Sequence, residues 1–317
     1  MKTNAFAELL RSRGFRSLFS AQLLGALNDN LYRMIVSLFA VSLGLGAAAE
    51  RGAIALIGVL FILPYLFFSG LAGRLSDRFC KGRVFAATKL CEVAIMILAA
   101  LALGSGRIEA MLAVLFLIAT QAAFASPARY GLVPEIVEAR HLSPANGLGE
   151  MSVFMAIILG GALGGVLFEI ASGDLRLLAA PLVLVALAGW LISRNIRPPV
   201  AAPRAAAFAE GGLLRGLRLL RDSRPMRVAV IGMTHFWFVG ALLQLDLIVY
   251  GKDVLGLGGV GIGVLQAALG VGIMAGCIAA GQISGDRVEL SLVPVGAAGM
   301  GVAGLVLANA APSTALA

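Results

Sequence analysis

Residues Phe19 to Leu43 read FSAQLLGALNDNLYRMIVSLFAVSL, an apolar run that also contains Asn28, Asp29, Asn30 and Arg33. A helix that crosses the ~30 Å hydrocarbon core of a bilayer needs about 20 mostly apolar residues, and this run is long enough. A charged side chain at the centre of such a helix costs roughly 2.5–3.5 kcal/mol to insert. We therefore expect a membrane-spanning helix whose polar side chains face protein or water rather than lipid.

The polar and small residues of this run recur every three or four positions, so that on a helix they form one stripe. The stripe consists of Gln22, Gly25, Ala26, Asp29, Arg33 and Ser37. Asp29 and Arg33 stand one turn apart, which allows them to pair and lowers the cost of burying either charge. The pair has two interpretations: self-neutralisation inside a helix bundle, or a polar patch on the wall of a transport cavity. Asn28 and Asn30 favour the second, because they supply more hydrogen-bonding groups than a self-contained pair requires.

The composition is that of an all-α polytopic membrane protein. The chain has 317 residues, 60% of them hydrophobic and 13% charged, and its mean hydropathy of +0.95 lies outside the range of soluble domains. The formal charge of +8 does not indicate a nucleic-acid partner, because the basic residues lie in short segments between apolar runs and have few aromatic neighbours. Cys80, Cys91 and Cys277 are isolated, so we expect neither a disulfide framework nor a metal site.

Nine apolar segments have the length of membrane spans. They lie at approximately 18–43, 53–73, 84–103, 110–126, 147–169, 176–193, 228–250, 260–281 and 291–310. If alternate connections lie on opposite sides, the basic residues on the side away from the N-terminus are Arg51, Arg107, Arg176 and Lys252. Apart from Arg33 and Lys89 inside spans, all other Lys and Arg residues share the side of the N-terminus. By the positive-inside rule, this skew predicts a cytoplasmic N-terminus.

A hydrophilic connection, Arg194 to Arg227, divides the spans into a group of six and a group of three. The prolines in its first part predict an extended linker. In its second part, Leu213 to Arg221, leucine and arginine residues take different sides of a helix. This fits either a basic helix on an anionic membrane surface or a plain cytoplasmic helix. The predicted organisation is an N-terminal six-helix bundle at 1–193, a linker at 194–227 and the first three helices of a second bundle at 228–317.

A weak internal repeat supports this division. Gly73-Arg-Leu-Ser-Asp77-Arg78 closes the second span, and Gly281-Gln-Ile-Ser-Gly-Asp286-Arg287 closes the eighth with one residue inserted. These spans are equivalent if each half has six helices, a construction common among transporters. On that count the chain ends three spans short of twelve, and we expect this portion alone to be unstable or inactive.

The segment Gly73-Arg-Leu-Ser-Asp-Arg-Phe-Cys-Lys-Gly-Arg83 resembles the cytoplasmic loop between spans two and three of the major facilitator superfamily. The resemblance implies that Gly73 permits close helix approach and that Asp77 pairs with basic groups and a helix N-terminus to latch one conformation. Arg78 and Arg83 complete this gate. Gly82 lies later than in the commonest form of the pattern. The alternative is an ordinary loop that satisfies the charge rule.

A second signature comprises Ser126-Pro-Ala-Arg-Tyr-Gly-Leu-Val-Pro-Glu135, Leu142-Ser-Pro-Ala-Asn-Gly-Leu-Gly-Glu150 and Ile157-Ile-Leu-Gly-Gly-Ala-Leu-Gly-Gly165. With Ala21–Asn30 and Lys81-Gly-Arg83, it resembles the bacterial lysophospholipid transporter branch of that superfamily. The resemblance implies a major facilitator fold truncated to about nine of twelve helices. It also implies flipping of lysophospholipids across the inner membrane for reacylation. Some members are fused to acyltransferase and acyl-ACP synthetase domains, so a fused or associated acyltransferase is among the partners that the resemblance allows, and its domain would lie beyond residue 317.

The second signature also carries structural expectations. Its prolines would break the helices between residues 126 and 150. The pairs Gly160/Gly164 and Gly161/Gly165 predict close helix packing. Glu150 either caps the start of span five or makes a polar contact at the inner end of the cavity.

Other polar residues inside spans complete the candidate site. Lys89 and Glu92 stand one turn apart near the start of span three, where lysine can extend to the interface, and we expect a structural pair. In span seven, His235 either carries a coupling proton or makes an interhelical hydrogen bond. The candidate cavity residues are Gln22, Asn28, Asp29, Asn30, Arg33, Gln121, Glu150, His235 and Gln244.

The leading hypothesis for function is a monomeric secondary carrier, not an enzyme, that alternates access between two bundles. Its cargo would be a lysophospholipid or a similar amphiphile, because a charged patch suits a head group and apolar walls suit one acyl chain. Asp29, Asn30 and Arg33 would contact the head group or a coupling Na+ or H+. We expect no bound cofactor, and membrane lipids as the other contacts.

Two hypotheses come from other classes. A lipid acyltransferase would carry a His followed five residues later by Asp, but His141 leads to Asn146 and His235 leads to Gly240. The chain could instead be an inactive or scaffolding fragment of a larger acyltransferase fusion. Within the carrier hypothesis, the alternative to lysophospholipid flipping is transport or efflux of another small amphiphile.

Overall fold

The computed structural model describes residues 5–44, 46–171, 174–196, 218–257, 259–284, 289 and 291–309, and these residues are almost all helical with no strand among them. The helices are α1 (Ala5–Arg11), α2 (Arg13–Ser42), α3 (Ala47–Arg78), α4 (Lys81–Ser105), α5 (Ile108–Ile136), α6 (Leu142–Ala171), α7 (Ala179–Ser193), α9 (Arg224–Val249), α10 (Gly259–Ser284) and α11 (Leu292–Asn309). Short turns of 3-10 helix, η1 (Ala139–His141) and η2 (Leu175–Leu178), lead into α6 and α7. A π-helical turn, η4 (Tyr250–Val254), ends α9.

Nine long helices in the described chain coincide with the nine predicted spans, so the predicted all-α polytopic fold is confirmed. Seven of them are long and apolar enough to cross a membrane by length and composition. α2 is not among these seven, because its central polar residues lower its mean hydropathy, and α11 supplies a shorter apolar helix, Leu292–Leu307. The polar stripe therefore hides the first span from a hydropathy criterion.

The connection predicted between residues 126 and 150 is mostly helical. α5 continues through Pro127 and Pro134 to Ile136, and α6 begins at Leu142. Proline removes one backbone donor and crowds the preceding turn, but a helix in a membrane bundle tolerates it when its neighbours hold the segment. The expectation that these prolines break the helices is therefore wrong.

Tight turns join helices at the other end of the bundle. Gly106 follows α4 with φ of 65°, the left-handed conformation that glycine adopts without strain. α5 starts two residues later, at Ile108. This short connection holds α4 and α5 antiparallel and adjacent.

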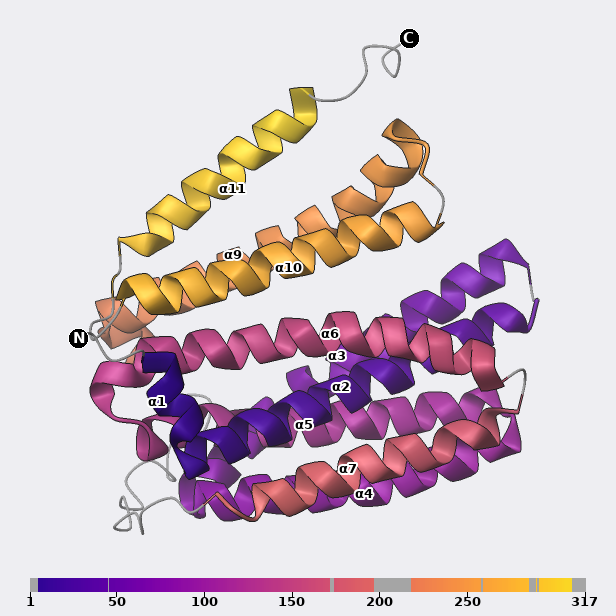
Figure 1. Ribbon diagram of the computed structural model, residues 1–317, viewed down its shortest axis with the longest axis horizontal. Coiled ribbons are helices and arrows are strands. Elements are labelled where there is room, and N and C mark those ends of the chain that lie inside the picture. Colours follow the sequence, from indigo (N-terminus) through magenta and orange to yellow (C-terminus); the bar gives the residue numbers. More distant parts are fainter. Residues whose placement is uncertain are drawn as a thin grey trace.

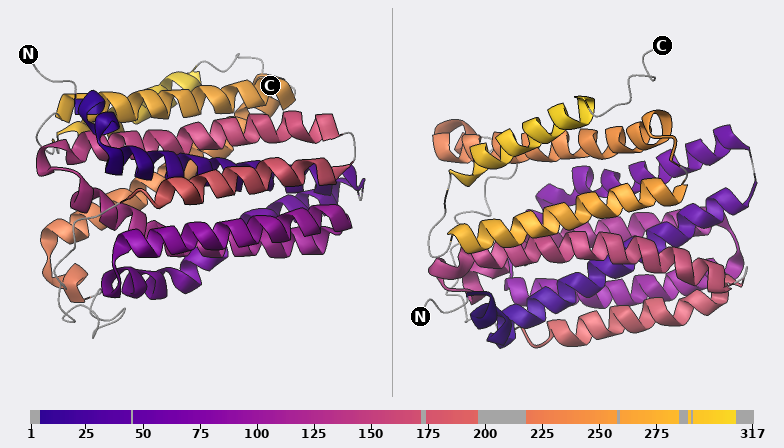
Figure 2. Two further views of the ribbon diagram at one scale, coloured as in Figure 1. Left: turned by 60° about the horizontal axis from the view of Figure 1, so that its bottom comes forward. Right: turned by 45° about the horizontal axis from the view of Figure 1, so that its top comes forward.

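The first six spans form one bundle (Figures 1 and 2). α2 packs against α6 and α7, α3 against α5, and α4 against both α5 and α7. α10 runs alongside α6 and makes the main contact of the last three helices with this bundle. α11 lies farthest from the bundle in Figure 1. The first bundle is therefore closely packed, whereas the last three helices rest on it through α10.

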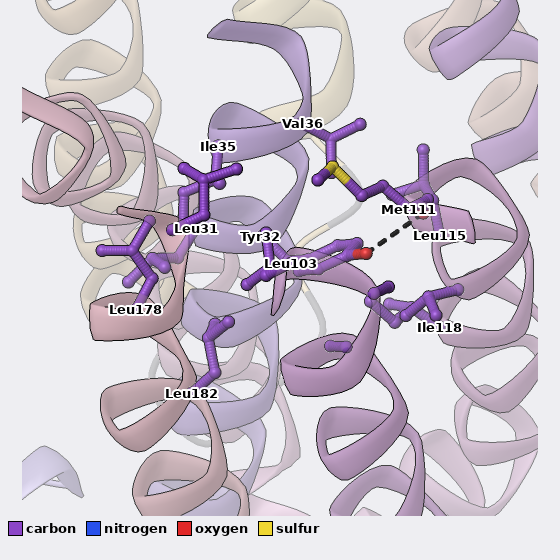
Figure 3. Close-up of a cluster of buried hydrophobic side chains, with 14 of the residues drawn as sticks. Leu31, Tyr32, Ile35, Val36, Leu103, Met111, Leu115, Ile118, Leu178 and Leu182 are labelled. Carbon is purple, nitrogen blue, oxygen red and sulfur yellow. Dashed lines mark hydrogen bonds between the residues drawn. The ribbon is translucent and has the colours of Figure 1, made fainter. Parts of the chain in front are cut away.

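Two apolar clusters fill the first bundle. The N-end cluster surrounds the start of α2 and consists of Leu9, Phe15, Leu18, Ala21, Val84, Phe85, Ala128, Leu132, Val133, Ala145, Leu148 and Ile196. The far cluster includes Leu31, Tyr32, Ile35, Val36, Met96, Leu103, Met111, Leu115, Ile118, Leu178 and Leu182. Figure 3 shows the far cluster, in which the Tyr32 hydroxyl donates a hydrogen bond to the Met111 carbonyl oxygen at 3.1 Å. The one phenol among these side chains is therefore buried with its donor satisfied.

α6 approaches α2 closely because Gly160 and Gly164 have no side chains. A Cβ atom at either glycine would lie 2.7 Å or 2.8 Å from a side-chain carbon of α2. The predicted close packing is thus confirmed for this pair. It is wrong for Gly161 and Gly165, where a Cβ atom would meet nothing within 4 Å, because these two glycines face away from α2.

The contact between α6 and α10 also depends on glycine. A Cβ atom at Gly147 of α6 would lie 2.7 Å from the carbonyl oxygen of Cys277 in α10. Gly281 of α10 lies close to both Pro144 of α6 and the ring of Phe6 in α1, each at 3.2 Å from its Cβ position. Backbone therefore meets backbone at this junction, and α1 covers its end.

The predicted linker lies mostly outside the described residues. The same is true of Asp286 and Arg287 in the repeat and of most of the basic segment Leu213–Arg221. On the far side of the linker, the Ser223 side chain accepts a hydrogen bond from the Met226 N–H at 3.4 Å and starts α9. The division into two bundles and a linker remains a prediction.

Candidate functional site

A band of buried polar side chains separates the two apolar clusters. Along α2 the N-end cluster stops at Ala21 and the far cluster begins at Leu31, and α4 and α5 show the same interruption. The buried polar side chains of this polar band are Gln22, Asn28, Asn30, Thr88, Lys89, Glu92, Gln121 and Ser152. Because each helix carries its polar residues between two apolar stretches, the band lies near the middle of the bundle.

Two of the candidate cavity residues fasten α2 to its neighbours. Gln22 Nε2 donates hydrogen bonds to the Gly149 carbonyl oxygen at 2.8 Å and to the Ser152 hydroxyl at 3.0 Å, both on α6. Asn28 is fully buried, and its Nδ2 donates to the Leu182 carbonyl oxygen on α7 at 3.1 Å. Asn28 therefore positions α2 and does not line open space, which helical spacing alone does not reveal.

The Asp29–Arg33 pair allowed by helical spacing is not formed in the described chain. Arg33 Nη2 donates instead to Asn30 Oδ1 at 2.7 Å, and its guanidinium lies over the Phe61 ring of α3, 5.1 Å from the ring centre. Asn30 Nδ2 in turn donates to the Ala26 carbonyl oxygen at 2.7 Å. Asp29 keeps a buried Oδ1 that has no hydrogen-bond partner among the described residues. The Asn30 amide, three residues before Arg33, thus takes the contact expected for Asp29.

Lys89 and Glu92 form the expected pair, with 2.6 Å between Nζ and Oε2. Their place differs from the expectation, because Lys89 is 5% exposed and Glu92 2%, so the lysine does not extend to the interface. The ammonium lies against the backbone of α2 at Gly25, where a Cβ atom would be 1.9 Å from Nζ. Gly25 is one turn before Asp29, so the pair lies beside the α2 face that carries this carboxylate. Gly25 in the α2 stripe is the sequence signal that marks room for such a partner.

Gln121, a candidate cavity residue, also belongs to the polar band. Its Nε2 donates to the Thr88 carbonyl oxygen at 2.9 Å, which links α5 to α4 one residue from Lys89. The side chain is buried. Gln121 therefore supports the Lys89 region rather than lining free space.

A small recess opens between α2, α5 and α6 on the N-terminal side of the polar band. It is bordered by Gln22, Arg129, Tyr130, Asn146 and Glu150 and by apolar residues such as Phe15 and Phe19. The Tyr130 hydroxyl donates to Glu150 Oε1 at 3.0 Å, and the Arg129 guanidinium lies over the Tyr130 ring at 4.3 Å. The volume of about 20 Å³ suits a water molecule and is too small for a lipid head group.

Glu150 is not a helix cap. α6 begins at Leu142, two turns earlier, and the favourable field of a helix N-terminus is confined to its first turn. The carboxylate instead accepts the Tyr130 hydrogen bond from α5. The second interpretation, a polar contact beside the candidate cavity, fits this arrangement.

The two sequence signatures meet at one ion pair that the sequence analysis missed. Lys81 Nζ, in the first turn of α4, lies 2.5 Å from Glu135 Oε1, near the end of α5. Gly131 makes room for the lysine, since a Cβ atom there would lie 2.6 Å from Lys81 Cδ and Cε. The two charged residues are 54 positions apart, so no local spacing predicts the pair.

The four residues of the predicted gate lie at or near the α3–α4 connection. Asp77, Arg78 and Arg83 are exposed, and Asp77 forms no hydrogen bond or ion pair with another described residue. Arg78 lies over the Phe79 ring at 5.7 Å. A Cβ atom at Gly73 would meet nothing within 4 Å, so no described helix approaches closely there. The assigned gate roles therefore remain predictions.

His235 and Gln244 are not brought into the polar band. Both are exposed on α9, and the His235 side chain makes no hydrogen bond within the part of the chain that the structure describes. The carbonyl oxygen of Gln244 accepts a hydrogen bond from Gln266 Nε2 at 3.1 Å. Trp237 of α9 stacks on Phe154 of α6 with ring centres 6.4 Å apart. α9 therefore meets the first bundle through an aromatic contact rather than through its predicted site residues.

Comparison with known proteins finds the same helical architecture elsewhere. The sequence profile of the Major Facilitator Superfamily matches residues 18–317. Lysophospholipid transporter LplT from Enterobacter sp. (strain 638) is 30% identical over 282 residues, covering 86% of this chain and 67% of the relative. LplT from Klebsiella pneumoniae (strain 342) is 28% identical over 284 residues with the same coverage. The crystal structure of the human organic anion transporter MFSD10 (TETRAN) matches with a TM-score of 0.65 and 17% identity, covering 86% of this chain and 73% of that chain.

Proposed function

The chain belongs to the Major Facilitator Superfamily, and we propose that it flips lysophospholipids across the bacterial inner membrane by alternating access. The resemblance to proteins named lysophospholipid transporter supports this cargo. The chain spans about two thirds of the length of these relatives, so transport by the whole protein is part of the proposal. An acyltransferase, fused or associated, would consume the cargo.

The observation that carries the proposal is the polar band between two apolar clusters. A lysophospholipid has a charged head and one acyl chain, and a bundle with charged groups at mid-depth and apolar side chains to either side can hold both parts. One carboxylate oxygen of Asp29 has no partner among the described residues, and Arg33 is partly exposed, so these two remain free to change partners. They are the head-group or coupling-ion contacts that we assign first, with Na+ or H+ as the ion.

The remaining assignments follow the topology. The excess of Lys and Arg on the N-terminal side supports a cytoplasmic N-terminus. The α3–α4 connection then lies in the cytoplasm, where Asp77, Arg78 and Arg83 would act as a gate. The exposed Asp77 carboxylate has no partner among the described residues, which leaves it available for a contact formed in another conformation.

Uptake of radiolabelled lysophosphatidylethanolamine tests the proposal. The full-length protein is expressed in spheroplasts of a bacterial strain that lacks its own lysophospholipid transporter. We expect uptake and acylation that Asp29→Asn lowers at least tenfold at unchanged expression, because a neutral amide keeps the size but removes the charge. Asp174→Asn is the matched control. Asp174 caps η2, at the end of the bundle away from the N-terminus, and asparagine caps equally well.

Two results would overturn the proposal. If wild-type protein is folded and expressed but moves no lysophospholipid, the proposed cargo is wrong. If the same protein exports an unrelated amphiphile, that amphiphile becomes the cargo. Full activity of Asp29→Asn would leave lysophospholipid transport standing but would withdraw the role assigned to this carboxylate.

A further inference from the structure

We infer that the buried Lys89–Glu92 ion pair determines which head-group charge the carrier selects. The inference rests on the proposed lysophospholipid transport and adds two residues to its site. Neither residue belongs to the candidate cavity set derived from the sequence. Their contribution is electrostatic, because both are buried and the Lys89 ammonium lies against α2 at Gly25, one turn before Asp29.

The geometry directs the pair toward α2. Glu92 Oε2 holds Lys89 Nζ at 2.6 Å, and the ammonium occupies the space that a side chain at position 25 would fill. A Cβ atom at Gly25 would lie 1.9 Å from Nζ and 3.3 Å from Glu92 Oε2. Gly25 is one turn before Asp29, so the pair sits directly beside the proposed head-group contact. On its other side, Lys89 Nζ lies 5.9 Å from the centre of the Phe85 ring.

The pair brings one positive and one negative charge next to the α2 face that carries Asp29. In a bundle interior the effective dielectric constant is about 20 or less, so a unit charge influences a ligand over many ångströms. Removing one member of the pair should therefore shift the preference between anionic and zwitterionic head groups according to the sign of the charge removed.

Stability does not explain the pair. A buried ion pair is commonly no more stable than apolar side chains of similar volume, because desolvation offsets the attraction. Here Glu92 Oε1 is buried without a hydrogen-bond partner among the described residues, which adds to that cost. A role in recognition accounts for the presence of both charges where packing alone does not.

The test measures a ratio of uptake for two lysophospholipids with the same acyl chain, anionic lysophosphatidylglycerol and zwitterionic lysophosphatidylethanolamine. Lys89→Met removes a positive charge and should lower the anionic-to-zwitterionic ratio about tenfold. Glu92→Gln removes a negative charge and should raise it about tenfold. That factor corresponds to unit charges roughly 12 Å apart at an effective dielectric constant of about 20. The double variant Lys89→Met/Glu92→Gln should return the ratio close to the wild-type value.

A further variant covers the case in which a single change leaves an unpaired buried charge and prevents folding. Gly25→Ala keeps every charge but forces the flexible Lys89 ammonium away from α2, so the ratio should fall severalfold. Gly161→Ala adds the same methyl group to α6 where nothing lies within 4 Å, and it should leave the ratio unchanged. The monodisperse fraction in detergent gives the amount of folded protein for each variant.

The outcomes separate the inference from the function on which it rests. If wild-type protein moves neither lipid, the proposed function fails. If wild type transports both and the ratio stays constant, or moves in the same direction in Lys89→Met and Glu92→Gln, the pair is structural and the inference is overturned. If neither single variant folds, an unchanged ratio in Gly25→Ala overturns it equally.

Discussion

α2 and α9 are the first helices of the two predicted halves, and both carry polar residues within a membrane span. α2 is enclosed by α5, α6 and α7, and its Asn28 is fully buried. α9 touches its neighbours little, and no residue in its most apolar stretch is buried. Asp29 therefore lies one turn from the buried Lys89–Glu92 pair, whereas His235 lies exposed. A polar residue in a span becomes part of a site only when neighbouring helices close around it.

α6 lies between these two helices and holds them in different ways. Toward α2 it presents Gly160 and Gly164, which let the two backbones approach closely. Toward α9 it offers the stacked contact of Phe154 with Trp237. The first interface leaves no room for a Cβ atom at either glycine, and the second rests on one pair of rings. Substitutions on different faces of α6 should therefore differ in how much they lower the free energy of unfolding.

The largest effect is expected at Gly160. Leucine at this position would drive a side chain into Asn30 and the Leu27 carbonyl oxygen of α2, where a Cβ atom alone would lie 2.7 Å and 2.9 Å away. We expect a loss of about 3 kcal/mol in the free energy of unfolding, since overpacking commonly costs 1–3 kcal/mol. Unfolding in detergent measures it. Gly161→Leu, one residue along on the open face, is the control and should keep the free energy of unfolding of the wild type. Equal destabilisation by both substitutions would contradict the packing argument.

The next effect separates buried from exposed polar residues. Asn28→Ala removes the hydrogen bond from α2 to the Leu182 carbonyl oxygen and leaves a small cavity. We expect a loss of about 1–2 kcal/mol, the upper range for interhelical hydrogen bonds in membranes. His235→Ala on α9 should change the free energy of unfolding by less than about 0.5 kcal/mol, as surface substitutions usually do. A larger effect at His235 than at Asn28 would reverse the comparison.

The junction of α6 and α10 should respond to a single methyl group. In Gly147→Ala the new Cβ would lie 2.7 Å from the Cys277 carbonyl oxygen, so α10 must move away. In a Cys80→Ser/Cys91→Ser background, which leaves one thiol, we expect Cys277 to react severalfold faster with a maleimide and the stability loss to be about 1 kcal/mol. Gly149→Ala is the control, because nothing lies within 4 Å of its Cβ position. Unchanged labelling would show that the junction is loose.

The smallest effect is expected at the Lys81–Glu135 ion pair. Both side chains are partly exposed, at 23% and 16%, so solvent screens their attraction. A double-mutant cycle with Lys81→Met and Glu135→Gln should give a coupling energy of about 1 kcal/mol or less. The Arg140–Glu138 pair, exposed at 56% and 69%, provides the comparison and should show no measurable coupling. A strong coupling at the exposed Arg140–Glu138 pair would show that burial does not determine the coupling energy of these ion pairs.

Much of the fold could be predicted from the sequence, because hydropathy is a sum over neighbouring residues. The nine spans were readable from the length of their apolar runs, and the Gly160/Gly164 contact was readable from the spacing of the two glycines. The predictions that proved wrong are those in which packing against neighbouring helices overrides a local sequence rule. Pro127 and Pro134 stay inside α5, and Glu150 sits two turns inside α6, because helices in a bundle continue past the point at which local signals would end them.

The candidate site was predictable only in part. The α2 stripe correctly marked Gln22 and Gly25 as residues that meet other helices, and Asn28, which lies outside the stripe, meets α7 as well. Which helix each of them meets depends on the rotation of α2 about its axis, and spacing along one helix does not contain that angle. Spacing is insufficient even within α2, because Arg33 had two acceptors within one turn and bonds to Asn30 instead of Asp29.

By itself the sequence determined that the chain is a polytopic helical membrane protein of a particular superfamily, because the length, apolarity and motifs of each segment are local properties. Only the tertiary structure decided that Lys89 reaches Gly25 and that Lys81 reaches Glu135. These contacts join helices far apart in the chain, and they depend on how the helices pack as a set. The physical reason is that burial, and with it the strength of every charge in the polar band, is produced by neighbours rather than by the residue itself.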